Sequence, residues 1–240
     1  MSLSIIIPVY NESSQIPITI KKLSVLKNKL NDFEIIFIDN LSSDDTLKKL
    51  KFYTKKKSYF KIYKSKKRGL GSAISTGIIK SKKKYICIFM SDMSDDIKDL
   101  VKYFKIISKN KLDAVFGSRF LSQSKVKNYP KHKLILNRFI NNIIKLIFLS
   151  DYNDFTNAFK IYRRSTLNKL FPLVSENFNI FLEIPLKIIT RNFTYKIIPI
   201  NWTGRKKGTS KFRIKELGSM YLFTLLYCLF EKILLRKNEL

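Results

Sequence analysis

The feature that most constrains this 240-residue sequence is a regular alternation of short apolar runs with longer amphipathic segments. The runs at 3–9, 34–38, 60–63 and 85–90 have the length and composition of buried strands. Helices are predicted over 14–30, from capping residues at 42–46 to 54, from 71 to 80 and over 96–108. Such alternation predicts one α/β domain with a parallel sheet and right-handed crossovers.

Polar residues follow the predicted strands, and the end of the fourth strand is the most acidic. There, Met90 is followed by Asp92, Asp95 and Asp96. Open α/β sheets bind ligands outside the carboxyl ends of their parallel strands, which is where these carboxylates would lie. Asp92 would help a hard cation to hold phosphates, while the residues from Ser94 to Asp96 suit the first turn of the next helix.

A glycine-containing turn, Gly69-Leu70-Gly71, precedes another predicted helix. It partly matches a dinucleotide-binding fingerprint, but the third glycine would fall at Ile74 and the segment follows the third strand rather than the first. The pattern therefore argues against a Rossmann dehydrogenase. What remains is a basic turn containing Arg68 at a helix N-terminus, which suits an anion.

The formal charge of +29 indicates an anionic partner, namely a phosphate-bearing substrate, an acidic membrane surface or nucleic acid. Compositional bias toward lysine is an alternative explanation of the charge. Nucleic-acid binding is disfavoured because the basic residues do not cluster on a recognisable reading element. Cys87 and Cys228 lie in apolar segments, so buried free thiols and a reducing cytoplasm are expected.

A series of motifs resembles those of family 2 glycosyltransferases with the GT-A fold. The first are Ser4-Ile-Ile-Ile-Pro-Val-Tyr-Asn-Glu12, Ile38-Asp-Asn-Leu-Ser-Ser-Asp-Asp-Thr46, Arg68-Gly-Leu-Gly-Ser-Ala73 and the acidic strand end. Later motifs narrow the resemblance to the dolichyl-phosphate mannose synthase branch: Gly117-Ser-Arg-Phe120, Asp154-Phe-Thr-Asn-Ala-Phe-Lys-Ile-Tyr162 and Arg205-Lys-Lys-Gly-Thr-Ser-Lys211. The resemblance extends over residues 3–215 and implies a mostly parallel central sheet with helices on both faces.

The same resemblance implies an inverting transferase that moves a sugar from a nucleotide-sugar donor to a polyprenyl phosphate, dolichyl or undecaprenyl, assisted by Mg²⁺ or Mn²⁺. A departing nucleoside diphosphate needs cationic stabilisation from a metal, Arg or Lys. A phosphate acceptor is already ionised at neutral pH, so the reaction demands no strong general base. A soluble or lipid-linked glycan is an alternative acceptor, and a catalytically impaired scaffold protein is an alternative to an enzyme.

The functional residues of the family fall on matching positions of this sequence. The nucleotide-sugar donor would contact Pro8, Tyr10, Asn11, Glu12, Asp39, Asn40, Arg68, Gly71 and Asp92. Phosphates of the donor or acceptor would contact Arg119, Arg138, Arg205, Ser210 and Lys211. Asp154 and Glu183 match sugar-side or structural acids, and the catalytic roles fall to Asp92, Arg119 and Lys211.

Two positions depart from the family pattern. Met90 replaces the first acid of the Asp-x-Asp metal motif, and Asn40 replaces the usual second acid after the second strand. A thioether is a poor ligand for Mg²⁺ or Mn²⁺, which prefer oxygen. Asp92 would then hold the metal with donor phosphates and water, helped by Ser94 or Asp95, unless metal dependence is weakened or activity is lost.

Two segments, 133–149 and 217–230, are strongly apolar. Lysine and arginine interrupt the first, and the second is uncharged for only fourteen residues, so neither is expected to span a bilayer. Both suit amphipathic helices in a membrane interface, with packing against the sheet as the alternative. The expected organisation is a GT-A domain over 1–215 and an amphipathic helix over 216–240, peripheral on the cytoplasmic, inner face of an acidic membrane.

Overall fold

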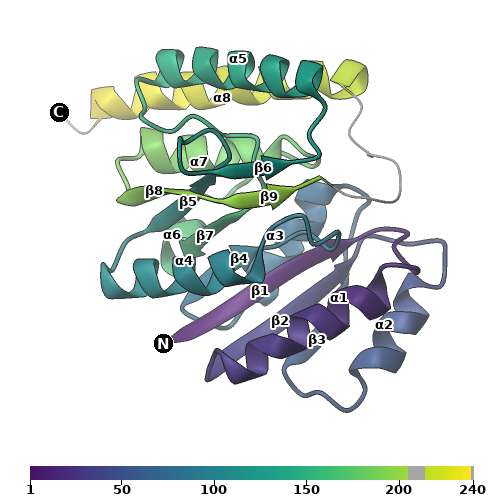
Figure 1. The fold of residues 1–240 in the computed structure, drawn as a ribbon. Coiled ribbons are helices and arrows are strands. Elements are labelled where there is room, and N and C mark those ends of the chain that lie inside the picture. Colours follow the sequence, from purple (N-terminus) through teal and green to yellow (C-terminus); the bar gives the residue numbers. More distant parts are fainter. Residues whose placement is uncertain (205–213, 239–240) are drawn as a thin grey trace.

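The computed structural model describes residues 1–204 and 214–238, and a seven-stranded sheet lies at its centre (Figure 1). The strand order is β3-β2-β1-β4-β7-β5-β8. Only β7 runs antiparallel to its neighbours among the described strands of this sheet. The strands are β1 (Ser2–Val9), β2 (Asp32–Asp39), β3 (Phe60–Lys64), β4 (Tyr85–Ile88), β5 (Ala114–Ser118), β7 (Lys160–Arg163) and β8 (Tyr195–Pro199); β6 (Lys125–Lys127) and β9 (Asn201–Thr203) form a separate parallel pair.

Helices cover both faces of the sheet. The core on one face includes α1, α2 and α4, and the core on the other includes α3, α6 and α7, with α5 and α8 farther out (Figure 1). The helices are α1 (Ile16–Leu23) with the 3₁₀ turn η1 (Ser24–Asn28), α2 (Thr46–Thr54), α3 (Leu70–Lys80), α4 (Ile97–Lys109), α5 (Lys131–Phe148), α6 (Arg164–Lys169), α7 (Ile180–Thr190) and α8 (Ile214–Asn238).

The apolar strands are buried because each supplies side chains to two cores. In β1, Ile5 and Ile7 pack into the core with α1, α2 and α4, whereas Ile6 packs on the opposite side with α3. This follows from the period of two along a strand, which turns successive side chains to opposite faces. A strand that is covered on both faces is apolar throughout, which is the pattern that the sequence shows.

The predicted sheet of mostly parallel strands with helices on both faces is confirmed, with local differences at element ends. The first helix has Pro17 near its start, as expected, but it ends at Leu23 and continues as a 3₁₀ turn instead of reaching Leu30. The fourth strand ends at Ile88, two residues before its predicted end. Asp96 caps α4 by accepting a hydrogen bond from the amide of Lys98 at 2.8 Å, as its position predicts.

The two apolar segments form α5 and α8. Helix α8 packs against α7, and the Nζ of Lys232 in α8 donates to the carbonyl of Phe148 at the end of α5, at 2.9 Å. In the described ranges, none of the helices combines the length and apolarity that crossing a bilayer requires. The proposed boundary between a domain at 1–215 and a helix at 216–240 stays a prediction.

Candidate functional site

The carboxyl ends of the parallel strands form one edge of the sheet, and the residues expected to bind the donor lie there. Pro8 is the second-last residue of β1, and Tyr10 directly follows that strand. Arg68, in the turn after β3, has its guanidinium 4.9 Å from the centroid of the Tyr10 ring. Its Nη2 also donates to the Tyr10 hydroxyl at 2.6 Å. The ring and the cation are therefore held together at this edge.

Hydrogen bonds join the loops that follow β1 and β2. The Oδ1 of Asn11 accepts from the amide of Ser43 at 2.9 Å, and the amide of Glu12 donates to the Oγ1 of Thr46 at 2.8 Å. Asp39 ends β2 and is buried. Because these hydrogen bonds join the loop after β1 to the loop after β2, the residues predicted around Asn11 and Asp39 to bind the nucleotide lie near one another.

The turn between β3 and α3 is held by the buried side chain of Asn40 and by a backbone segment that is distant in the sequence. Asn40 accepts a hydrogen bond from the amide of Gly69 at 3.0 Å. The amides of Gly71 and Ser72 donate to the carbonyl of Glu176 at 2.8 and 3.3 Å. The sequence predicts an anion site at this helix N-terminus, but a carbonyl already takes up these two amides. Gly71 thus packs against the Glu176 segment and Asn40 holds the turn that carries Arg68, while the donor contacts expected of both stay predictions.

The loop after β4 presents Asp92 in a defined orientation. Its Oδ1 accepts from the amide of Ser94 at 3.1 Å and from the Ser94 hydroxyl at 2.8 Å. Met93 between them has a φ of 57°, a left-handed conformation that closes the turn. Thr19 in α1 anchors the loop from behind by donating to the carbonyl of Ser91 at 2.7 Å. The Asp92 carboxylate is partly exposed at the same edge as Tyr10 and Arg68.

Asp95, three residues farther along, is a different kind of acid. It is buried, and its Oδ1 has no hydrogen-bond partner among the described residues. Burial, reinforced by the neighbouring Asp92, raises the pKa of Asp95 to about 8. Its backbone pairs with Trp202 in β9, so it ties the acidic loop to the two-stranded sheet. At neutral pH the Asp95 side chain is therefore largely protonated.

The raised pKa predicts a pH-dependent stability. Because the folded chain keeps the Asp95 proton up to about pH 8 and the unfolded chain releases it near 3.8, the free energy of unfolding should fall as pH rises through that window. One proton sets a limit of about 1.4 kcal/mol per pH unit. Asp95→Asn should remove this fall in urea unfolding at pH 5 and 8, while Asp96→Asn should retain it. Equal pH dependence in Asp95→Asn and the wild type would contradict the assignment.

Arg119, which follows β5, is part of a nearly buried ion pair. Its Nη2 and Nε donate to Asp154 at 2.7 and 2.9 Å, and its own amide donates to the same carboxylate at 2.8 Å. Only 8% of the Arg119 side chain and none of the Asp154 side chain is exposed. Although burial lowers it, the neighbouring Asp154 carboxylate keeps the pKa of Arg119 above its ordinary value. The Asp154 carboxylate thus holds Arg119 in place, and the sugar-side or structural role expected for it stays a prediction.

Aromatic rings enclose the Arg119 guanidinium. The centroids of Phe120, Tyr129 and Trp202 lie 5.4, 5.6 and 5.7 Å from it, so it sits in an aromatic pocket. Arg138 is exposed on α5, and its guanidinium also lies 5.6 Å from the centroid of the Phe120 ring. The two arginines predicted to meet phosphates are thus brought together around one ring, Arg119 inside and Arg138 at the surface.

Lys160 was given no role by the sequence, yet it lies beneath this ion pair. Its side chain is buried, and its Nζ donates to the carbonyls of Phe155, Asn157 and Phe181. Burial lowers the pKa of Lys160 to about 7, against the opposing effect of the nearby Asp154. Two of these carbonyls belong to the loop just before Lys160, and the third, from Phe181, comes from α7, so tertiary packing completes the set.

Glu183 lies away from the strand ends, on the first turn of α7. Its two carboxylate oxygens accept from the amides of Val174 and Ser175 at 2.9 and 2.8 Å, and Lys187 pairs with it at 3.1 Å. Buried in this way, Glu183 holds the backbone at Val174 and Ser175, and the sugar-side or structural role expected for it stays a prediction. Arg205, Ser210 and Lys211 lie outside the described residues.

The acidic loop fits a divalent cation only in part. Met90 offers a thioether, and the described chain contains no group of three or more His, Cys, Asp or Glu side chains arranged for a metal. Mg²⁺, however, is commonly held by one or two carboxylates together with substrate phosphates. Asp92, oriented by Ser94, matches that requirement. The residues therefore suit a cation that is shared with a bound diphosphate and do not form a complete protein cage.

Comparison with known proteins agrees with this geometry. The family model described as "Glycosyl transferase family 2" matches residues 4–171. The dolichyl-phosphate beta-glucosyltransferase of Dictyostelium discoideum is 28% identical over 216 residues, covering 84% of this chain and 66% of that protein. The dolichol-phosphate mannosyltransferase of Pyrococcus furiosus is 26% identical over 226 residues, covering 90% of this chain and 61% of that protein. This chain thus spans less than two thirds of either relative.

A solved structure shares the fold at low sequence identity. Glucosyl-3-phosphoglycerate synthase from Mycobacterium tuberculosis, in complex with Mn²⁺, uridine diphosphate and glucosyl-3-phosphoglycerate, superposes with a TM-score of 0.70. The two chains are 15% identical, and the match covers 95% of this chain and 79% of the other. At that identity the likeness concerns the fold alone. The family match over residues 4–171, on a sheet whose strand ends gather the expected motifs, shows that this chain belongs to glycosyl transferase family 2.

Proposed function

We propose that this chain transfers a sugar from a nucleoside-diphosphate sugar to a polyprenyl phosphate at the cytoplasmic surface of a membrane. The observation that carries the proposal is that two relatives, from different organisms, are both named for transfer involving dolichyl phosphate. The edge formed by Tyr10, Arg68 and Asp92 supports it, because it combines an aromatic ring, a cation and an oriented carboxylate.

In this mechanism the residues of the edge bind and neutralise the donor. Asp92 would hold Mg²⁺ or Mn²⁺, whose charge stabilises a departing diphosphate. Arg68, fixed against Tyr10, adds positive charge to the donor side of the edge. Arg138, exposed on α5 beside the enclosed Arg119, would meet the acceptor phosphate. An ionised phosphate attacks without a strong general base, so none of these residues needs to remove a proton.

A lipid acceptor is supported by the surface of α5 and α8. Large apolar side chains are exposed along both helices. On a surface that faces only water, such positions are usually polar. Together they suit insertion into the interface of a membrane, and the net charge of +29 favours an acidic leaflet. The exposed set is Ile135, Leu136, Phe139, Ile140, Ile143, Leu146 and Ile147 on α5, with Met220, Leu222, Phe223, Leu226, Phe230, Ile233 and Leu234 on α8.

The membrane proposal predicts a specific loss of vesicle binding. Phe223 and Phe230 are 60% and 63% exposed on α8, and replacing both by Ser should weaken binding to acidic vesicles by roughly tenfold or more. The matched control is Phe52→Ser, since Phe52 is 75% exposed on α2, on the other face of the sheet. Vesicle flotation at low salt measures the effect. Equal flotation of both variants, or no flotation of the wild type, would favour a soluble glycan acceptor.

The donor site can be tested separately by titration calorimetry with uridine and guanosine diphosphates, with and without Mn²⁺. Because Asp92 supplies a single oriented carboxylate, nucleotide and cation are expected to bind together, with each strengthening the other. Strong cation binding without nucleotide would contradict a shared site. Failure of both nucleotides to bind would remove the basis of the proposed function.

A further inference from the structure

The buried Glu183 fixes a segment of chain that has no regular structure of its own. Its carboxylate accepts one amide on each oxygen, from Val174 at 2.9 Å and from Ser175 at 2.8 Å. Lys187, also buried and one turn along α7, neutralises it at 3.1 Å. Since both oxygens are used, the carboxylate sets the position of this backbone in two directions.

The fixed segment in turn holds the turn that carries Arg68. The carbonyl of Glu176 accepts the first amides of α3, from Gly71 at 2.8 Å and Ser72 at 3.3 Å. The approach is so close that a Cβ on Gly71 would lie 2.0 Å from the carbonyl oxygen of Ser175. Gly69 has a φ of 137° and a Cβ there would meet the Glu176 oxygen at 2.3 Å. The turn therefore cannot shift toward the segment without a clash, and two hydrogen bonds join it to the segment.

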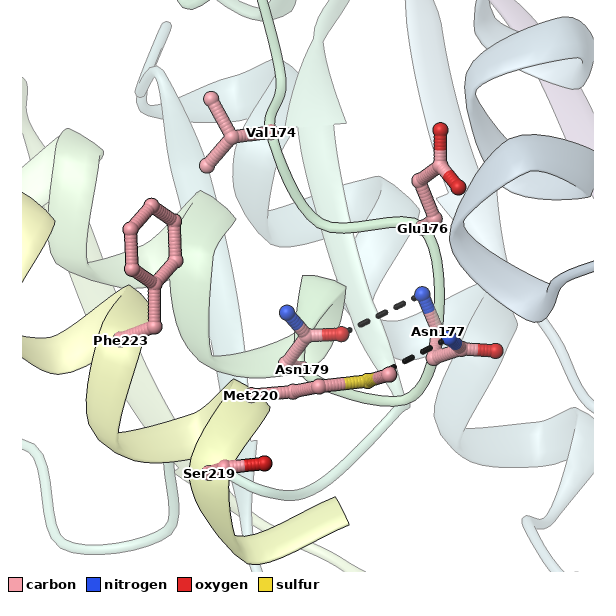
Figure 2. A pocket seen from close by; sticks show the side chains of 7 residues that line it. All are labelled: Val174, Glu176, Asn177, Asn179, Ser219, Met220 and Phe223. Carbon is pink, nitrogen blue, oxygen red and sulfur yellow. Dashed lines mark hydrogen bonds between the residues drawn. The ribbon is translucent and has the colours of Figure 1, made fainter. Parts of the chain in front are cut away.

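Helix α8 holds the same segment from the other side. Thr224 is buried, its Oγ1 accepts from the side chain of Asn179 at 2.9 Å, and it lies 3.3 Å from the Oγ of Ser175. Val174, Glu176 and Asn179 line a pocket of about 440 Å³ together with Met220 and Phe223 of α8. Figure 2 shows the 174–179 segment on one side of this pocket and α8 on the other. The segment is therefore clamped between α3 and α8, with Glu183 beneath it.

We propose that Glu183 is a positioning residue for donor binding: through the 174–176 segment and the N-terminus of α3, it sets where the Arg68–Tyr10 pair stands. The proposal rests on the proposed function, because it assumes that this pair contacts the nucleotide sugar. Glu183 touches no substrate in this scheme. It acts through Glu176, whose carbonyl occupies the N-terminus of α3 in place of an anion, while Arg68 in the preceding turn contacts Tyr10.

The test uses a variant that keeps the buried charge balanced. Glu183→Gln alone would leave the buried Lys187 without its nearer carboxylate and with only Glu231, at 3.9 Å, which is destabilising in its own right. The double variant Glu183→Gln, Lys187→Met removes both charges, together with the hydrogen bonds from Lys187 to the carbonyls of Leu170 and Pro172. The Gln side chain keeps one acceptor oxygen, whereas the amides of Val174 and Ser175 now donate to two. We expect its dissociation constant for the nucleoside diphosphate that the wild type binds, measured with Mn²⁺, to rise roughly tenfold.

A coupling measurement separates positioning from general damage. In an Arg68→Met background, the same double change should raise the dissociation constant by less than about twofold, because the group that it positions is gone. If the double change instead raises the dissociation constant by the same factor with and without Arg68, its role is unrelated to Arg68. Asp113→Asn is the matched structural control: Asp113 accepts from Thr194 and Thr166 just before β5, at the opposite edge of the sheet. It should lower the melting temperature and leave nucleotide binding unchanged.

The outcomes distinguish this inference from the proposed function. A folded double variant that binds nucleotide as the wild type does would overturn the inference and leave the function standing. If the double variant does not fold, Thr224→Val decides instead: it removes the hydrogen bonds to Asn179 and Ser175 without changing charge, and should raise the dissociation constant roughly threefold. Unchanged binding in Thr224→Val overturns the inference. A wild type that binds neither nucleotide overturns the donor site itself, and this inference with it.

Discussion

Replacing Asp92 by Asn is expected to reduce the rate of sugar transfer by about a thousandfold. The amide oxygen of Asn can still accept the hydrogen bonds that Ser94 donates to Oδ1 at 2.8 and 3.1 Å, so the turn should persist. What disappears is the negative charge that would hold a divalent cation against the diphosphate. Initial rates at saturating Mn²⁺ and donor measure the effect, with the melting temperature as a check on folding.

Asp96→Asn provides the matched control in the same loop. Asp96 caps α4 through the amide of Lys98, and Asn caps a helix about as well as Asp, so both stability and transfer should be retained. Near-normal transfer by Asp92→Asn, or by the wild type in the presence of a chelator, would contradict the role given to Asp92. Equal losses in both variants would indicate that charge in the loop matters in general.

The second large effect concerns stability. Asp154→Ala should lower the free energy of unfolding by about 3–5 kcal/mol, because it leaves the Arg119 guanidinium buried without its partner. Three hydrogen bonds from Arg119 to Asp154, at 2.7 to 2.9 Å, would be lost together. Urea unfolding followed by fluorescence of Trp202, which lies beside Arg119, measures the change.

Removing both members of this pair is the informative comparison. Arg119→Met combined with Asp154→Leu should cost less than Asp154→Ala alone, because no charge is left buried. A loss below about 1 kcal/mol in Asp154→Ala would show that the pair is solvated in the folded protein, since exposed pairs contribute little. The double variant should still be inactive if Arg119 also contacts phosphate.

Local patterns predicted the elements of this fold because they are local properties. Runs such as Leu3 to Val9 read as strands that are covered on both faces, and this is where they lie in the sheet. Asp96 was expected to begin a helix because its side chain reaches an amide only two residues away. The gathering of Tyr10, Arg68 and Asp92 at one edge followed from parallel connectivity, which brings the carboxyl ends of successive strands together.

The side-chain partners at the site were not predictable in the same way. The turn after β3 looked like an anion site because its own residues suit one, but the Glu176 carbonyl that fills it comes from the loop before α7. The bond from Gly69 to Asn40 likewise joins two loops, which gives a structural reason for an amide at that position. Lys160 is held partly by the carbonyl of Phe181, which comes from α7, 21 residues farther along the chain. Contacts of this kind depend on tertiary packing, which periodicity and capping rules do not describe.

The central claim is transfer of a sugar to a lipid phosphate, and one measurement tests it most directly. Purified protein is incubated with Mn²⁺, a panel of radiolabelled nucleotide sugars and vesicles containing a polyprenyl phosphate, and the mixture is then extracted with organic solvent. Matched vesicles containing the corresponding polyprenol, which lacks the phosphate, serve as the control. The account predicts label in the organic phase for at least one nucleotide sugar, only with the phosphate-bearing lipid, and not with Asp92→Asn. Label that stays in the aqueous phase with every donor, while the protein is folded and binds nucleotide, would contradict the claim.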